Sequence, residues 1–150
     1  MKITRSIPMV CALLLWPASG WLHADLKAAL AERDLGKRSK LALDNAGEVL
    51  KAVRESYQKG EDQALGPLLT EFEDSVSLAW DSLESTGKNP RKSPRWFKQA
   101  EIETRTLLKK LESLQHDMSF EDRGLLDPAR VRLQKVHDDL LVDLMEGKHE

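Results

Sequence analysis

Apolar residues recur at steps of three and four along most of this chain, and this repeat is the feature that most constrains the fold. Such spacing places a continuous apolar stripe on one face of an α-helix. No stretch shows the alternation of apolar and polar residues that a half-buried strand requires. Four stretches carry the stripe: Leu43, Ala46, Val49, Leu50, Val53 and Tyr57; Leu65, Leu68, Leu69, Phe72, Val76, Ala79, Trp80 and Leu83; Phe97, Ala100, Thr104, Leu107, Leu108, Leu111 and Leu114; Ala129, Leu133, Val136, Leu140 and Leu144.

Capping residues and glycines set the expected boundaries of the first two helices. Asp34 is a suitable N-cap, but Gly36 weakens a helix across its position, so the clear pattern is expected from Lys37. Gly60 is expected to stop this helix, because glycine favours the position after a helix C-terminus. Asp62 is the expected cap of the second helix.

Pairs of a capping residue and a proline mark the starts of the other two helices. Ser93 suits the N-cap and Pro94 the first helical position, since proline lacks the N–H that would be unpaired there. This third helix is expected to run to about Gln115. The pair at 127–128, aspartate then proline, predicts the start of the last helix by the same logic, and Gly147 is expected to end it.

The sequence therefore predicts an all-α fold, a small antiparallel bundle of about four helices formed by two helical hairpins. Its connections are short, as is usual between antiparallel neighbours in a bundle. We expect one bundle domain over residues 37–147. A flexible or frayed helical segment at 25–36 is expected before it, and a disordered tail at 148–150 after it.

Residues 1–24 have the organisation of a secretory signal peptide. Lys2 and Arg5 form the positive n-region, and the apolar run Ile7–Trp16 is too short to cross a bilayer of about 30 Å as a helix. Cleavage is expected after Ala24, with Gly20 as the alternative; an uncleaved membrane anchor is the other interpretation. We expect an exported protein, in the bacterial periplasm or outside the cell, with no transmembrane segment in its mature chain.

The sequence offers little that could carry catalysis or bind a metal. Its only cysteine, Cys11, lies in the apolar run, so the mature chain is expected to have no disulfide and no thiolate ligand. No nucleophile motif, glycine-rich phosphate loop or paired-histidine spacing occurs. We therefore predict a protein that is not an enzyme, without catalytic, cofactor-binding or metal-binding residues.

Several side chains that could serve a ligand site have a simpler structural interpretation. His116 is expected at a helix end, where the helix dipole favours a cation, and His137 on the surface. Met118 and Met145 are interpreted as core filler. Trp80 and Trp96 are interpreted as core anchors rather than as walls of a ligand cage.

Charge is divided sharply between two neighbouring segments. Residues 61–84 contain acids and no base, whereas residues 86–98 contain bases and no acid. Such segregation can mark a surface for a partner. The alternative is that the two blocks neutralise each other within the fold, for example through Arg91 or Lys92 with Glu84 or Asp81, or stay solvated. The candidate interaction surface consists of Lys88, Arg91, Lys92, Arg95, Trp96 and Lys98.

The overall charge narrows the class of partner. Removing residues 1–24 removes two bases and no acid, which takes the formal charge from −2 to −4 and argues against a general nucleic-acid binder. We expect a non-catalytic exported protein that binds another macromolecule, either a protein or an anionic envelope component, through a charged surface. The alternative is an exported bundle that binds a small ligand or a metal. The sequence sets no oligomeric state.

Overall fold

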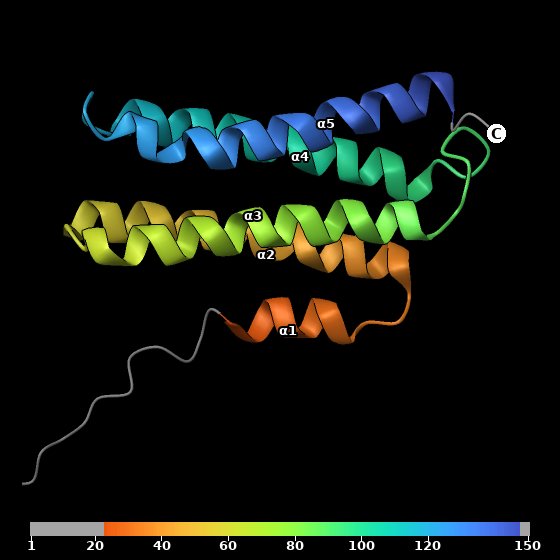
Figure 1. The fold of residues 1–150 in the computed structure, drawn as a ribbon, viewed down its shortest axis with the longest axis horizontal. Helices are drawn as coiled ribbons and strands as arrows, with labels where there is room; N and C mark the ends of the chain where they lie inside the picture. The colour runs from red at the N-terminus through yellow and green to blue at the C-terminus, as the bar shows by residue number, and fades with distance from the viewer. Residues whose placement is uncertain (1–22, 148–150) are drawn as a thin grey trace, which may run out of the picture.

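A computed structural model describes residues 23–147, and within this range the chain is helical with no strand. Its elements, coloured along the chain in Figure 1, are α1 (His23–Ala31), α2 (Leu35–Lys59), α3 (Asp62–Ser85), α4 (Arg95–Asp117), the 3-10 turn η1 (Arg123–Leu126) and α5 (Asp127–Glu146).

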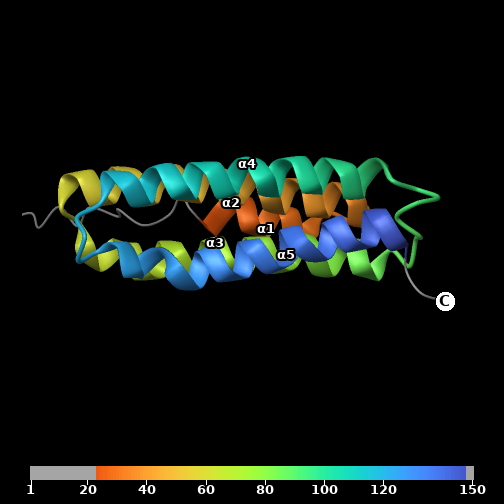
Figure 2. The same ribbon diagram turned by 90° about the horizontal axis from the view of Figure 1, so that it is seen from above.

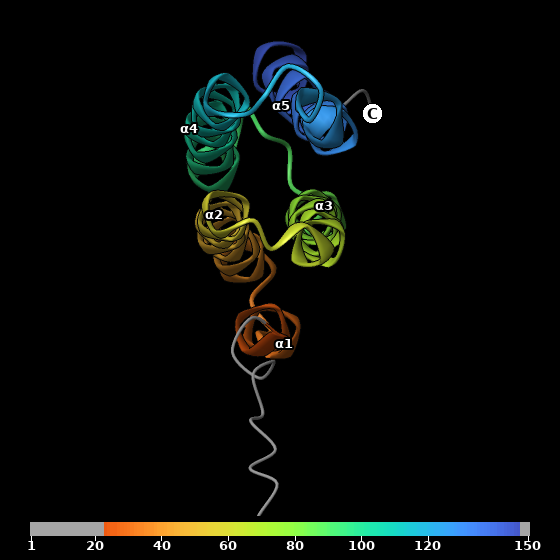
Figure 3. The ribbon, with the colours of Figure 1, turned by 90° about the vertical axis from the view of Figure 1, so that its left-hand side faces the viewer.

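The helices form three layers, which are seen end-on in Figure 3. The antiparallel hairpin of α2 and α3 is the middle layer, the hairpin of α4 and α5 lies on one side of it, and α1 lies on the other. Helix α2 packs against α3 and α4, and α5 packs against α4 and α3. The predicted all-α bundle of two helical hairpins is therefore confirmed.

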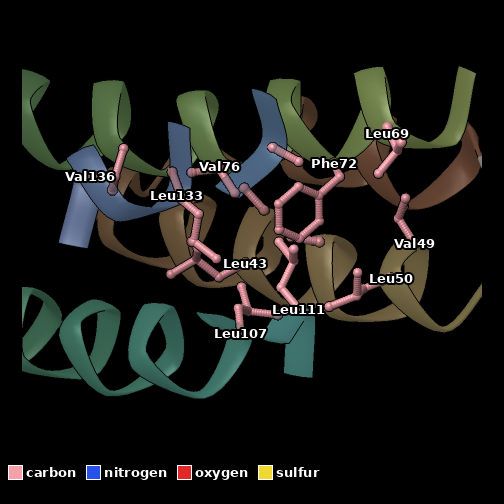
Figure 4. Packing of buried hydrophobic residues seen from close by; sticks show 14 of the residues in the cluster. Leu43, Val49, Leu50, Leu69, Phe72, Val76, Leu107, Leu111, Leu133 and Val136 are labelled. Atoms are coloured by element: carbon pink, nitrogen blue, oxygen red, sulfur yellow. The ribbon is translucent and has the colours of Figure 1, made fainter. Parts of the chain in front are cut away.

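The core fills the space between the two hairpins, as Figure 4 shows. Phe72 and Val76 from α3 and Leu107 from α4 are buried in one cluster with side chains of α2 and α5. Each lies in the middle of a stripe predicted from the sequence. The helical repeat therefore identified the buried faces of all four long helices correctly.

The predicted helix ends at Asp34, Gly60 and Gly147 are present, whereas the predicted caps Asp62, Ser93 and Asp127 are not. Asp62 and Asp127 are instead the first residues of α3 and α5, and neither helix has a side-chain hydrogen bond at its cap. The Asp34 carboxylate accepts a hydrogen bond from Lys37 N at 2.9 Å, and Gly60 ends α2 with a left-handed φ of 71°. However, α2 already begins at Leu35, so Gly36 lies inside it. Ser93 does not cap α4, which begins at Arg95 after Pro94 without a side-chain hydrogen bond at the cap.

Helix α1 covers the face of the middle layer that points away from α4 and α5 (Figure 3). Ala29 is fully buried and α1 packs against α2, so part of the 25–36 segment is helical and in contact with the bundle. The predicted signal peptide, apart from its last two residues, and the predicted tail at 148–150 lie outside the described residues. Among the helices of residues 23–147, none has the length and apolarity needed to cross a membrane.

One end of the bundle is tied by side-chain hydrogen bonds. At this turn end, which comprises the α2–α3 turn and the segment from Ser119 to Leu126, the Tyr57 hydroxyl donates to Asp122 Oδ2 at 2.9 Å and accepts from Ser119 N at 2.9 Å. The Ser119 hydroxyl donates to the same carboxylate oxygen at 2.7 Å. These bonds connect the end of α2 to the segment that joins α4 and α5.

Candidate interaction surface

The basic stretch lies at the other end of the bundle, in the connection from α3 to α4 and the first turn of α4 (Figures 1 and 2). All five of its bases are exposed: Lys88, Arg91, Lys92, Arg95 and Lys98. Pro90 and Phe97 between them are buried and anchor the stretch to the bundle. The predicted surface residues are thus brought together on one exposed segment.

Asn89 fixes the backbone of this connection. Its side-chain oxygen accepts a hydrogen bond from Arg91 N at 2.9 Å, and its carbonyl oxygen accepts one from Ser93 N at 2.9 Å. Asparagine commonly forms such local turns through its side chain. The connection therefore holds its shape through one polar residue and its apolar anchors, and the basic side chains themselves take no part in these bonds.

The C-terminal end of α5 packs against this connection. Gly147, the residue after α5, has a φ of 78°, and a Cβ added to it would lie 3.2 Å from Arg91 Cδ and 3.4 Å from Asn89 Nδ2. The stem of Arg91 therefore lies against the C-terminal end of α5. The carbonyl groups at a helix C-terminus favour a nearby cation, so this position suits one base of the five.

Trp96 is half-buried and packs against the core, as does Trp80, so both are core anchors as predicted. The Trp96 indole lies directly over Gly36 in the first turn of α2, where a Cβ would overlap the ring. The guanidinium carbon of Arg95 lies 4.8 Å from the centre of the same ring, within the range of a cation–π contact. Much of the indole surface is therefore in contact with other residues of the protein.

The charges of the basic stretch are not paired within the described part of the chain. Five ion pairs join described residues. Four of them each join two residues of the same helix, and the fifth joins Arg54 of α2 to Asp117 of α4. None involves a base of the stretch, and none joins it to the acidic block of residues 61–84. Ion pairing between described residues thus does not explain why these bases are grouped.

Sequence reasoning missed that another base belongs to the same end of the molecule. Because Trp96 lies over Gly36, the first turns of α2 and α4 are side by side. Lys37 follows Gly36 and is exposed, and the first turn of α2 contains no acid. We call the surface formed by Lys37 and the five bases of the stretch the basic end. The sequence alone gives little sign that Lys37 belongs to this surface, because no local pattern indicates that Gly36 contacts Trp96.

Two side chains lie where the sequence analysis did not place them. His137 was predicted on the surface but is buried, with Nδ1 at 3.0 Å from the Thr104 hydroxyl of α4. It faces inward because it follows Leu133 by four residues and precedes Leu140 by three. Met145 was predicted in the core but is 76% exposed, whereas Met118 is buried as predicted. His116 lies in the last turn of α4, as predicted.

An apolar groove of about 450 Å³ lies between α1 and α3. Leu26 and Leu30 form its α1 wall, and Pro67 and Thr70 its α3 wall, while Asp74 adds a carboxylate. Leu30 is 54% exposed, so the groove opens to solvent. Within residues 23–147, no group of three or more histidine, cysteine or acidic side chains is arranged to hold a metal ion.

Comparison of the chain with protein-family models finds no matching family, and comparisons with curated proteins and with solved structures find no match either.

Proposed function

We propose that this chain is an exported, non-catalytic protein that binds an anionic macromolecule through its basic end. The observation that carries the proposal is the group of five exposed bases, Lys88, Arg91, Lys92, Arg95 and Lys98, none of which forms an ion pair with a described residue. An anionic partner would supply the charges that the described fold does not.

The placement of two of these bases strengthens the proposal. Arg95 and Lys98 lie in the first turn of α4, which contains no acid and has no side-chain cap. A helix N-terminus carries partial positive charge, so bases there are unfavourable by roughly 0.3–1 kcal/mol each. Bases kept at an unfavourable position are better explained by a partner than by the stability of the helix.

Binding to two anionic probes tests this proposal. Vesicles that contain phosphatidylglycerol, and soluble polyglutamate, are mixed with the parent protein and with a variant carrying Arg91→Gln, Lys92→Gln and Arg95→Gln. A base near an anionic surface contributes about 1 kcal/mol, so the variant should bind about one hundredfold more weakly and with a smaller salt dependence. Vesicles of neutral phosphatidylcholine should bind neither protein.

A variant with the same loss of charge elsewhere is the control. Lys59, Lys109 and Lys110 are exposed and form no ion pair with a described residue, and they lie outside the basic end. Changing these three lysines to glutamine should leave probe binding within a fewfold of the parent. Equal binding by the parent and the Arg91–Lys92–Arg95 variant, or no binding by the parent, would contradict the proposal.

Export is tested separately by mass spectrometry of the protein recovered from the cell envelope fraction. The n-region, the short apolar run and the small residue Ala24 predict a mature N-terminus between Trp21 and Asp25. An intact Met1 on the accumulated protein would contradict cleavage.

The groove between α1 and α3 supports a second candidate function, the binding of a small apolar ligand. Its volume of about 450 Å³ and its walls of Leu26, Leu30 and Pro67 resemble those of small-molecule sites, which are concave and mostly apolar. An environment-sensitive apolar dye should bind the parent, and Leu30→Asp should abolish that binding without unfolding the protein. Dye binding that is unchanged in Leu30→Asp would rule out this groove.

A further inference from the structure

The turn end of the bundle contains a pocket of about 420 Å³ between the first half of α3 and the segment that leads into α5. Its walls combine apolar side chains with carboxylates. Leu65 and Leu69 are buried beneath it, and Leu125 at its side is 50% exposed. Three acidic residues line it as well: Asp62, Glu73 and Asp122.

These carboxylates form no ion pair with a described residue. Asp122 Oδ2 accepts hydrogen bonds from the Tyr57 and Ser119 hydroxyls, and Oδ1 has no hydrogen-bond donor among the described residues. The hydroxyl of Ser119, and then that of Tyr57, lower the pKa of Asp122, so its carboxylate stays ionised to a lower pH than an ordinary aspartate. Apolar walls beside carboxyl groups suit a long basic side chain, because its aliphatic stem packs on apolar surface while its charged head contacts the carboxyl groups.

The bases that form no ion pair with a described residue therefore lie at one end of the bundle, and the acid-lined pocket lies at the other. Figure 1 shows the α3–α4 connection and the α2–α3 turn at these opposite ends. We infer that the pocket accepts a basic side chain, Arg91 or Lys92, from the basic end of a second copy of this chain. The inference rests on the proposed function, since it makes the second copy one of the anionic partners of the basic end.

Such a contact joins two different surfaces, so it is head-to-tail rather than symmetric, and it can continue from one copy to the next. Exposed ion pairs are individually weak, and salt screens them over a distance of about 10 Å at 0.1 M. We therefore expect short oligomers that appear as the protein concentration rises, and that dissociate as salt is added.

Two variants, each with one altered end, test the inference by sedimentation velocity. Asp62→Asn with Glu73→Gln alters the pocket, and Arg91→Gln with Lys92→Gln alters the basic end; both leave Asp122 and Tyr57 intact. Circular dichroism should show both variants folded. The parent should form a concentration-dependent series of oligomers at low salt. Each variant alone should remain a monomer, because it keeps only one of the two complementary ends.

Mixing the two variants is the decisive step. The intact basic end of the pocket variant fits the intact pocket of the basic-end variant, so the mixture should form dimers and nothing larger. A parent that stays monomeric at every concentration, or a pocket variant that associates as the parent does, would overturn the inference. A symmetric dimer in either variant would overturn it too.

Vesicle binding separates this inference from the proposed function. The pocket variant should bind vesicles that contain phosphatidylglycerol as the parent does, because its basic end is intact. If the pocket variant associates as the parent does and the parent binds vesicles, the role of the pocket in self-association is refuted and the proposed function stands. If the parent binds no anionic probe but the two variants still form the mixed dimer, the broader anionic-partner proposal is refuted and the second copy remains as the partner.

Discussion

Both ends of this bundle connect antiparallel helices, but different kinds of side chain hold the two connections in place. At the turn end, the Tyr57 hydroxyl bonds both the Asp122 carboxylate and Ser119 N, so polar groups are paired across elements. At the basic end, the Asn89 turn and the buried Pro90 and Phe97 fix the backbone. The charges there are left without ion pairs to described residues.

This difference separates the polar groups that bond to one another within the fold from the charges that form no ion pair with a described residue. Removing a polar group from the turn end breaks internal bonds, whereas removing charge from the basic end breaks no ion pair between described residues. The following predictions test that separation, beginning with the core that both ends share.

The largest effect is expected from Leu107→Ala. Leu107 is buried among side chains of the α2–α3 hairpin, so its truncation should lower the free energy of unfolding by about 2–5 kcal/mol. Glu103→Ala, one turn earlier on α4, should have little effect. Urea unfolding measures both. Equal and small losses of stability in the two variants would show that the buried face of α4 has been assigned wrongly.

Gly36→Ala tests the apolar anchor of the basic end. The new Cβ would overlap the Trp96 indole, so overpacking should cost about 1–3 kcal/mol. Gly47→Ala in the same helix is the matched control, because its Cβ would meet only Leu107 Cδ2 at 3.8 Å. Alanine should stabilise the helix there by about 0.5–1 kcal/mol. If both variants melt alike, the Trp96–Gly36 contact does not hold the two helix starts together.

Tyr57→Phe tests the polar bonds of the turn end. It removes the hydroxyl shared by Asp122 and Ser119 N, and should cost about 1–2 kcal/mol in urea unfolding. Ser85→Ala near the basic end removes only a bond to Asp81 O within its own helix, so its effect should stay below about 0.5 kcal/mol. A Tyr57→Phe variant as stable as the parent would remove the contrast between the ends.

A smaller effect is expected in the acid range. The hydroxyls of Ser119 and Tyr57 lower the pKa of Asp122 below its ordinary value of 3.8. The stabilisation from this carboxylate is therefore fully present above about pH 4 and is lost as the pH falls through the lowered pKa. NMR titration should show the pKa moving back toward 3.8 in Ser119→Ala. A pKa at or above 3.8 in the parent would contradict the bonding described here.

The sequence predicts the helices and their buried faces well, because both depend on local spacing. The capping roles of Asp34 and Gly60, for example, depend only on residues close to them in the chain. Gly36 was misjudged because its role depends on Trp96, about sixty residues away, whose ring needs a neighbour without a Cβ. His137 was misplaced although its spacing from Leu133 and Leu140 puts it on the buried face, because a buried histidine needs a polar partner and the Thr104 hydroxyl that serves as one lies on another helix.

The candidate surface was predictable in part. The grouping and exposure of Arg91, Lys92 and Arg95 follow from a short stretch rich in bases and turn residues. The addition of Lys37 depends on the packing of α2 against α4, and the pocket at Asp122 depends on three separate segments meeting. Such meetings between distant segments leave no local pattern in the sequence.

The most direct test of this account is urea unfolding of the variant with Arg91→Gln, Lys92→Gln and Arg95→Gln. If the basic end is kept for a partner rather than for the fold, the free energy of unfolding should remain within about 1 kcal/mol of the parent, since exposed charges contribute little. A loss of more than about 2 kcal/mol would show that these bases hold the bundle together, and would contradict the separation between the two ends.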